Sequence, residues 1–199
     1  TDIDIINFDA YLKALRKRHD YFHNNGCRLS DRGLDRPFAA DYTEAQIKQI
    51  FMRLRSNEAL SFDDCEKFKS AMMYEFALMY HECKWVMQLH LGALRRANTR
   101  MTKALGPDCG FDSIGDFEIA RPLARFLDRL DRNNQLPRTI LYNLNPADNA
   151  LMATMIGNFQ DGSAVGKMQW GSAWWFLDQK DGMEEQMRTL SNMGLLSRF

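Results

Sequence analysis

The stretch "VMQLHLGALRR", residues 86–96, is an apolar segment that runs into a histidine, a glycine and a pair of arginines. Its first residues have the composition of a short strand in an α/β protein. His90 stands where that strand would pass into its loop. Because α/β proteins usually place their chemistry in such loops, His90 is a candidate functional residue.

Other segments repeat this strand pattern, with helical patterns between them. The expected strands are "CRLS" (27–30), "KWVMQLH" (84–90), "RTILYNL" (138–144), "KMQWGS" (167–172) and "LLSRF" (195–199). The stretches between them are long enough for crossover helices, which predicts parallel pairing. Such a series builds either a doubly wound sheet or a (β/α) barrel, and the pattern alone leaves both open. No GxGxxG follows any strand, so a dinucleotide-binding sheet has no support.

Capping signals mark where the helices should begin. They are Thr43 with Gln46, Ser61 with Asp64, Asp181 with Glu184, and Asn145 before Pro146. Apolar residues at helical spacing follow Ser61 and predict a helix of about five turns that ends near His81. Gly26 and Gly194 are expected to end the helices before the first and last strands. We therefore expect a helical insertion at about 43–83, between the first two strands.

Composition excludes several classes of partner. The 199 residues are 45% hydrophobic and carry 26 basic and 26 acidic side chains, so the formal charge is zero. Balanced charge gives no electrostatic reason to expect a nucleic acid partner. No apolar run could cross a bilayer and the N-terminal stretch is too acidic for a signal peptide, so we expect no membrane partner and a cytoplasmic location.

The cysteines do not form a recognisable motif. None of the four lies in a CxxC pair, so disulfides are not expected. His81 and Cys83 are near neighbours with His90 beyond, but this spacing matches no common zinc framework. The sequence therefore predicts no zinc site here.

Polar and aromatic side chains follow the expected strands, and parallel pairing would gather them on one face. They are Ser30, Asp31 and Arg32; His90 and Arg95; Asn143 and Asn145; and Ser172, Trp174 and Trp175. Arginine binds carboxylates with two parallel hydrogen bonds, amides hydrogen-bond to hydroxyls, and tryptophan packs against the apolar side of a sugar. The set predicts a site for a small hydroxylated anion.

His90 itself has two interpretations. It could act as a general acid or base, or as a metal ligand, because its charge changes near neutral pH and its ring binds metals. It could instead be a buried histidine that is hydrogen-bonded to the backbone. No Ser-His-Asp arrangement is evident around it, and the sequence leaves both interpretations open.

Longer motifs give the chain a resemblance to a known family. They are "GCRLSD" (26–31), "LHLGALRRANTRM" (89–101), "LGPDCGFDSIGD" (105–116), "ILYNLNP" (140–146), "TMIGNFQ" (154–160), "GKMQWGSAWWFLDQKDGMEEQM" (166–187) and "MGLLSRF" (193–199). In order and spacing they resemble the uronate isomerases, also called glucuronate isomerases, of the amidohydrolase superfamily. The resemblance covers nearly the whole chain.

The resemblance implies a fold and an activity. The fold is an α/β one, part of a distorted (β/α)8 TIM-type barrel, and residues 1–199 would supply roughly strands four to seven and the start of strand eight as one partial barrel domain. The activity is aldose–ketose isomerisation, which interconverts D-glucuronate with D-fructuronate, and D-galacturonate with D-tagaturonate, by moving a proton between C1 and C2.

The resemblance also implies an internal fragment. Family members are more than twice as long, with a metal-binding HxH pair on the first strand and an aspartate, the expected base, on the last. Neither motif occurs here. We therefore expect the isolated chain to be inactive and to bind no metal tightly, although the intact enzyme could hold Zn²⁺ or Mn²⁺. Exposed strand edges favour a homo-oligomer.

Residue roles follow from the same resemblance. His90 is similar to the family's strand-five histidine and would be catalytic, either as a metal ligand or by polarising the substrate carbonyl. The uronate sugar would be bound by Asp31, Arg32, Arg95, Trp174 and Trp175. Arg32 departs from the family, which commonly has a histidine there. The alternatives are another metal-dependent amidohydrolase-type activity on the same scaffold, and a non-catalytic half-barrel that serves as an assembly module.

Overall fold

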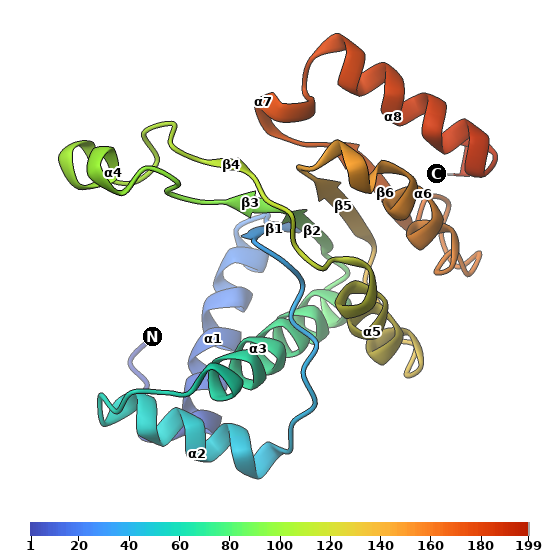
Figure 1. Ribbon diagram of the computed structural model, residues 1–199. Helices are drawn as coiled ribbons and strands as arrows, with labels where there is room; N and C mark the ends of the chain where they lie inside the picture. The colour runs from blue at the N-terminus through green and yellow to red at the C-terminus, as the bar shows by residue number, and fades with distance from the viewer. Residues whose placement is uncertain (199) are drawn as a thin grey trace.

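The computed structural model describes residues 1–198, and at its centre is a four-stranded sheet in which all neighbouring strands are parallel (Figure 1). The sheet order is β1 (Leu29–Leu34), β2 (Val86–Leu91), β5 (Thr139–Asn143) and β6 (Met168–Ser172). Outside it, β3 (Ala93–Leu94) pairs antiparallel with β4 (Ser113–Ile114). The predicted α/β fold with a parallel sheet is confirmed. Its strand order advances along the chain without the reversal typical of a doubly wound sheet.

Helices precede, connect and follow the strands. They are α1 (Phe8–Asn24), α2 (Glu44–Arg55), α3 (Phe62–Glu82), α4 (Thr99–Leu105), α5 (Ala120–Asp131), α6 (Asn149–Gly157), α7 (Trp174–Leu177) and α8 (Lys180–Met193), with 3₁₀ turns η1 (Pro146–Asp148) and η2 (Leu196–Arg198). Thr43 and Ser61 form the capping boxes that their sequences predict, and Asn145 caps η1. The β3–β4 pair and α4 project away from the sheet (Figure 1).

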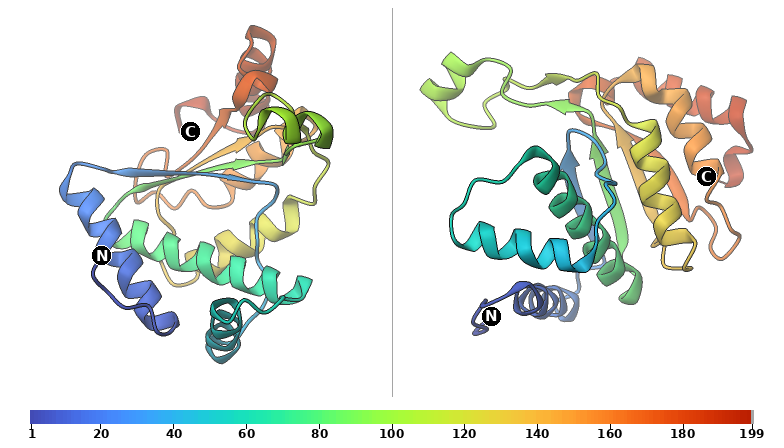
Figure 2. Two further views of the ribbon diagram at one scale, coloured as in Figure 1. Left: turned by 90° about the vertical axis from the view of Figure 1, so that its left-hand side faces the viewer. Right: turned by 60° about the horizontal axis from the view of Figure 1, so that its bottom comes forward.

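The two faces of the sheet differ in burial. Along β2, Met87, Leu89 and Leu91 are at most 2% exposed, whereas Gln88 and His90 are only partly buried. Figure 2 shows α3 and α5 lying along the same side of the sheet. The covered face packs against helices in one apolar core, while the other face is open.

A second, smaller core joins α1, α2 and α3. It contains Phe8, Ile47 and Phe51, and the rings of Phe8 and Phe51 meet edge to face with 5.6 Å between their centroids. Both α2 and α3 lie in the connection between β1 and β2. This segment therefore buries apolar surface of its own in addition to what it buries against the sheet.

The first expected strand, at 27–30, has the wrong bounds. β1 begins at Leu29 and continues to Leu34, because its length is set by pairing with β2 from Val86 to Leu91. Asp and Gly are depleted in strands, so the composition of "SDRG" (30–33) does not predict a strand. As a consequence Asp31 and Arg32 lie inside the strand rather than after it.

Two expectations near the C-terminal end are also wrong. Residues 196–198 of the expected strand at 195–199 form η2, since no neighbouring strand in the described part of the chain pairs with them; Phe199 lies outside the described residues. The expected cap at Asp181 is absent because α8 begins at Lys180, which puts Gln179 at the cap position and Asp181 inside the helix.

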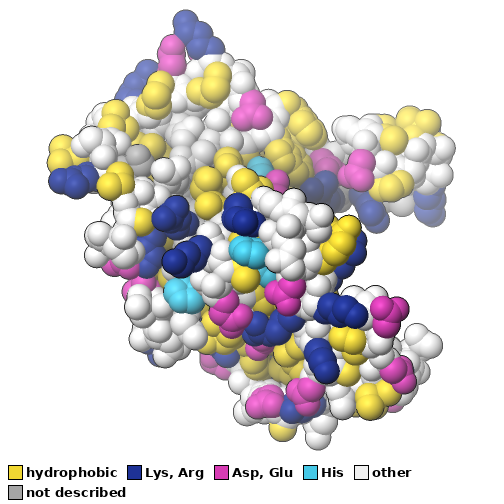
Figure 3. Space-filling view, turned by 180° about the vertical axis from the view of Figure 1, so that it is seen from behind, with side chains coloured by type: hydrophobic (Ala, Val, Ile, Leu, Met, Phe, Trp, Pro, Cys, Tyr) yellow, Lys and Arg dark blue, Asp and Glu magenta, His cyan; other side chains and the backbone are white. Residues whose placement is uncertain are grey.

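The surface carries charges of both signs. Figure 3 shows basic and acidic side chains interspersed over the rear of the molecule. Within residues 1–198 no helix combines the length and the apolar composition that a membrane crossing requires. All four cysteines are free thiols.

Candidate functional site

Polar side chains from neighbouring strands meet on the open face of the sheet. They come from β1 (Asp31), β2 (Gln88 and His90) and β5 (Tyr142), at positions that alternate with less exposed residues. The register places His90 beside Gly33 of β1 and Tyr142 of β5. Successive side chains of a strand point to opposite faces, so the same alternation that builds the core gathers these groups on its far side.

His90 is held by a carboxylate. Its Nδ1 lies 2.7 Å from Oδ1 of Asp31, and the His90 side chain is 17% exposed. A carboxylate accepts but does not donate, so the hydrogen on this bond belongs to Nδ1 of His90. Asp31 thereby selects the tautomer in which Nε2 of a neutral His90 can accept a proton or bind a cation.

Tyr142 supports the His90 ring from the side of β5. The two rings are stacked with 4.3 Å between centroids and 4° between planes, and the Tyr142 hydroxyl donates to Oε1 of Gln88 at 2.7 Å. Burial, together with the nearby charge of Asp31, raises the pKa of Tyr142 above its ordinary value, so the hydroxyl stays protonated near neutral pH. A Cβ at Gly171 of β6 would lie 2.4 Å from the Tyr142 ring, so only glycine leaves room for it.

Arg95 reaches the same face from the β3 connection. Its Nη1 donates to Oδ2 of Asp112 at 2.9 Å, and its guanidinium carbon lies 4.7 Å from the centroid of Trp174. A Cβ at Gly33 would lie 3.1 Å from Nη2 of Arg95, so the glycine in β1 lets the guanidinium approach the sheet. The cation is thus held between a carboxylate and an aromatic face.

The tryptophans of α7 form a wall next to His90. The ring centroid of Trp174 lies 6.5 Å from that of His90 and 5.5 Å from that of Trp175, and Trp175 is 62% exposed. Trp174 has a left-handed backbone, with φ at +56°, which is strained for a bulky residue. Structural strain at this position is consistent with a functional constraint on the direction of its ring.

Several predicted residues are placed elsewhere. Arg32 lies on the face opposite Asp31, where its Nη2 donates to the Tyr80 hydroxyl at 2.7 Å and its guanidinium covers the Phe76 ring at 3.8 Å. Asn143 is 1% exposed and its amide donates to Asn149. The structure therefore brings together His90, Asp31, Arg95, Trp174 and Trp175, but not Arg32.

Sequence reasoning missed three residues that shape this site. Gln88 lies two positions before His90 on β2, and Tyr142 lies beside His90 on β5. Both follow from the period-two alternation of strands, which was a signal that could have found them. Asp112, which fixes Arg95, lies in a loop and carried no such signal.

The arrangement is open rather than enclosed. The side chains of Asp31 and Arg95 are 57% and 43% exposed. A cavity of about 530 Å³ lies instead at the amino ends of the strands, lined by His81, Lys84 and Arg138 among others. The candidate site is placed at His90 because a histidine–carboxylate pair with an adjacent arginine can act on a substrate. The volume of the other cavity is not by itself a reason to assign chemistry to it.

Comparisons with known proteins show which family the chain resembles. The sequence profile of the glucuronate isomerase family matches residues 1–199. The uronate isomerase of Cellvibrio japonicus is 61% identical over 198 residues, covering 100% of this chain and 42% of the relative; that of Bacteroides thetaiotaomicron is 57% identical over 197 residues, covering 99% and 42%.

Solved structures show the same likeness in three dimensions. The uronate isomerase of Thermotoga maritima superposes with a TM-score of 0.88 at 33% identity, covering 98% of this chain and 41% of that one. The glucuronate isomerase of Caulobacter crescentus superposes with a TM-score of 0.81 at 27% identity, covering 96% and 38%. The chain therefore spans about two fifths of the length of the relatives it matches.

Fold and site together define an α/β protein with a parallel sheet whose open face carries an oriented histidine, an arginine and a tryptophan wall. Within that class the chain belongs to the glucuronate isomerase family.

Proposed function

We propose that the whole protein containing these residues is an aldose–ketose isomerase that interconverts D-glucuronate with D-fructuronate, and D-galacturonate with D-tagaturonate. Membership of the glucuronate isomerase family supports the reaction class. The single observation that carries the assignment of the site is the 2.7 Å pair of His90 and Asp31, which lies beside Arg95 on the open face of the sheet.

The sheet belongs, in this proposal, to a (β/α)8 barrel. The strands of its main sheet are all parallel and their order advances in one direction, and in the described residues α3 and α5 lie along the same face. These are the features of a barrel segment, in which helices surround the strands and the inner face points to the axis. The polar face that is open here would then line the interior near the carboxyl ends of the strands.

His90 would act at the carbonyl of the open-chain sugar. Isomerisation needs a base for the proton that moves between C1 and C2, and a group that stabilises the charge on the carbonyl oxygen. Since Asp31 fixes the ring and can stabilise an imidazolium, His90 suits the second task, or the transfer of a proton at the oxygen. Tyr142 keeps the ring in place without competing for its protons.

Arg95 and the tryptophans would bind the rest of the uronate. Only Nη1 of Arg95 is hydrogen-bonded among residues 1–198, so its remaining donors suit the substrate carboxylate. The flat ring of Trp174 and its neighbour Trp175 suit the C–H side of the carbon chain.

We propose that a divalent metal, Zn²⁺ or Mn²⁺, binds at this site in the whole protein but not in residues 1–199 alone. His90 fits as one ligand, because a metal-binding histidine usually donates its other ring N–H to a carboxylate, as His90 does to Asp31. No three-ligand group surrounds His90 in the described residues. When bound, the metal would polarise the carbonyl oxygen.

The test compares two histidines of the whole protein. We expect His90→Asn to lower turnover of D-glucuronate to ketose by about 100-fold or more, equivalent to about 2.7 kcal/mol, with little change in the melting temperature. His81→Asn is the matched control, since His81 is also partly buried but lies before β2, and it should leave turnover unchanged.

The two failures are distinguishable. Near-normal turnover of His90→Asn with a large loss of stability would show that His90 is a structural residue. No ketose from the unaltered protein, with either uronate, would refute the isomerase proposal itself.

A further inference from the structure

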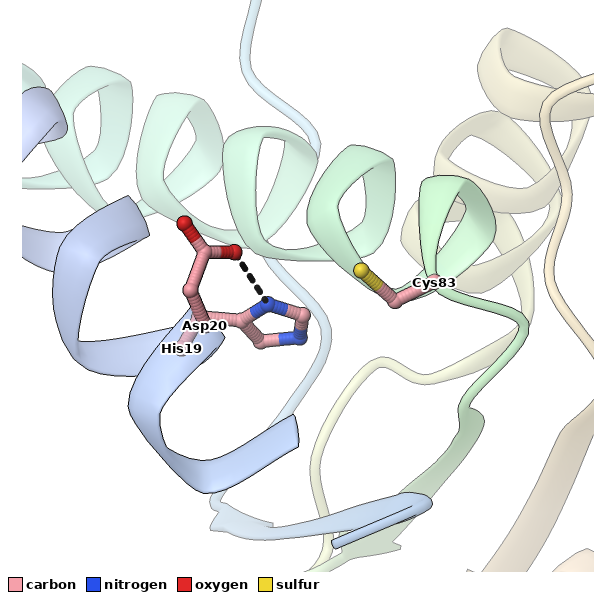
Figure 4. Close-up of side chains that lie close together, drawn as sticks. All are labelled: His19, Asp20 and Cys83. Atoms are coloured by element: carbon pink, nitrogen blue, oxygen red, sulfur yellow. Dashed lines mark ion pairs between the residues drawn. The ribbon is translucent and has the colours of Figure 1, made fainter. Parts of the chain in front are cut away.

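Three potential metal ligands from distant parts of the sequence meet where α1 passes the end of α3. They are His19 and Asp20 of α1 and Cys83, which caps α3 (Figure 4). One ligand atom from each of the three lies within 4.8 Å of the other two. Nitrogen, oxygen and sulfur donors thus converge in one place.

His19 is the unusual member, because it is buried without a hydrogen bond. It is 9% exposed, and its ring packs on Trp85 with 4.1 Å between centroids. Its Nε2 has no partner, and its Nδ1 lies 4.0 Å from Oδ1 of Asp20, beyond hydrogen-bond length. A buried polar side chain without a hydrogen bond is costly, and an ion bound at Nδ1, the nitrogen that faces Asp20, would give this ring a partner.

The charges around the cluster suit a divalent cation. Arg16 of α1 is paired with Glu82 at 2.5 Å, so these two charges largely cancel. Asp20 makes no ion pair except the long contact with His19 among residues 1–198. One carboxylate and one thiolate would together balance the two positive charges of the ion.

We propose that His19, Asp20 and Cys83 bind Zn²⁺, with solvent as the fourth ligand. A thiolate with a histidine favours Zn²⁺ over the harder Mn²⁺. Ligand bonds of about 2.0–2.3 Å place tetrahedral ligands about 3.3–3.8 Å apart, so the cluster must contract by roughly 1 Å. The Asp20 side chain is 66% exposed and free to make this movement. Binding replaces the thiol proton of Cys83, which leaves to solvent as the Zn–S bond forms.

This site is separate from the candidate active site. Cys83 precedes β2, whereas His90 is near the carboxyl end of the same strand, on its open face. A bound ion would tie α1 to α3, so its role is to stabilise the fold. The proposal does not rest on the isomerase assignment. It differs from the expectation from the sequence, which was that the isolated chain binds no metal tightly.

Cobalt is the probe for the test, because Co²⁺ bound to a thiolate gives a charge-transfer absorption that nitrogen and oxygen sites do not. The whole protein is stripped with a chelator and titrated with Co²⁺. We expect one equivalent to produce the band and Zn²⁺ to abolish it by displacement. Cys83→Ser should lose the band, and Asp20→Asn, an exposed change that should not impair folding, should weaken binding at least about tenfold.

Matched controls separate this site from other metal sites. Cys65→Ser removes another partly buried thiol of α3, and His90→Asn alters the candidate active site; both should keep the band. Zn²⁺ at about a hundred times its dissociation constant should raise the melting temperature by roughly 3 °C, and Cys83→Ser should lose this shift. A protein that shows no thiolate band, or a band that survives Cys83→Ser, would overturn the proposal.

Discussion

The two faces of β2 show how one short strand serves two purposes. On the covered face, Met87, Leu89 and Leu91 are almost completely buried in the main apolar core. On the open face, Gln88 accepts a hydrogen bond from Tyr142 and His90 is paired with Asp31. Because neighbouring side chains of a strand point in opposite directions, stability and chemistry can be assigned to alternate residues. Mutations on the two faces should therefore have different effects.

The largest effect is expected on the covered face. Leu89→Ala should lower the free energy of unfolding by about 3 kcal/mol, because it removes buried surface and leaves a cavity in the core. Gln88→Ala, one position away on the open face, should cost about 1 kcal/mol or less. Urea unfolding of both variants measures the difference. Equal losses of unfolding free energy in the two variants would contradict the proposed difference between the faces.

A smaller effect is expected from the carboxylate that orients His90. Asp31→Asn should reduce turnover of the whole protein by about 10- to 100-fold, since the amide no longer selects the His90 tautomer or stabilises its cation. The Asp31 side chain is 57% exposed, so the free energy of unfolding should change by less than about 1 kcal/mol. Steady-state kinetics and urea unfolding give the two quantities. Unchanged turnover would mean that the pair is structural.

The smallest effect concerns the ionisation of Tyr142. Burial is the main cause of its raised pKa and the charge of Asp31 is the second, so Asp31→Asn should lower this pKa only slightly. Its contribution to stability is present below the unfolded pKa and is lost as the pH rises through the folded value. Ultraviolet titration measures the shift, with Tyr142→Phe identifying the signal. A larger pKa in Asp31→Asn would contradict the geometry of the open face.

Local signals predicted much of the fold. The capping boxes at Thr43 and Ser61 and the long helix α3 depend on residues that are close in sequence, and all are present. β5 and β6 lie within the segments expected for them, and β2 extends one residue beyond its segment, since apolar strand composition is also a local property.

Features that depend on pairing were predicted less well. β1 gains its length from its neighbour β2, and the β3–β4 pair, absent from the sequence prediction, joins residues on either side of α4. The site shows the same division. His90, Asp31, Arg95 and the tryptophans were identified as candidates by position, but Arg32 was assigned to the wrong face because the strand was expected to end before it.

The sequence by itself determined the parallel α/β organisation, the main helix starts and membership of the glucuronate isomerase family. Only the tertiary structure decided which side chains meet: Asp31 and Tyr142 with His90, Arg32 with Tyr80, and His19 with Cys83. Propensity and periodicity act over a few residues, whereas these contacts join segments far apart in the chain. The contacts made by the strands also depend on strand register, in which a shift of one residue turns every side chain to the opposite face.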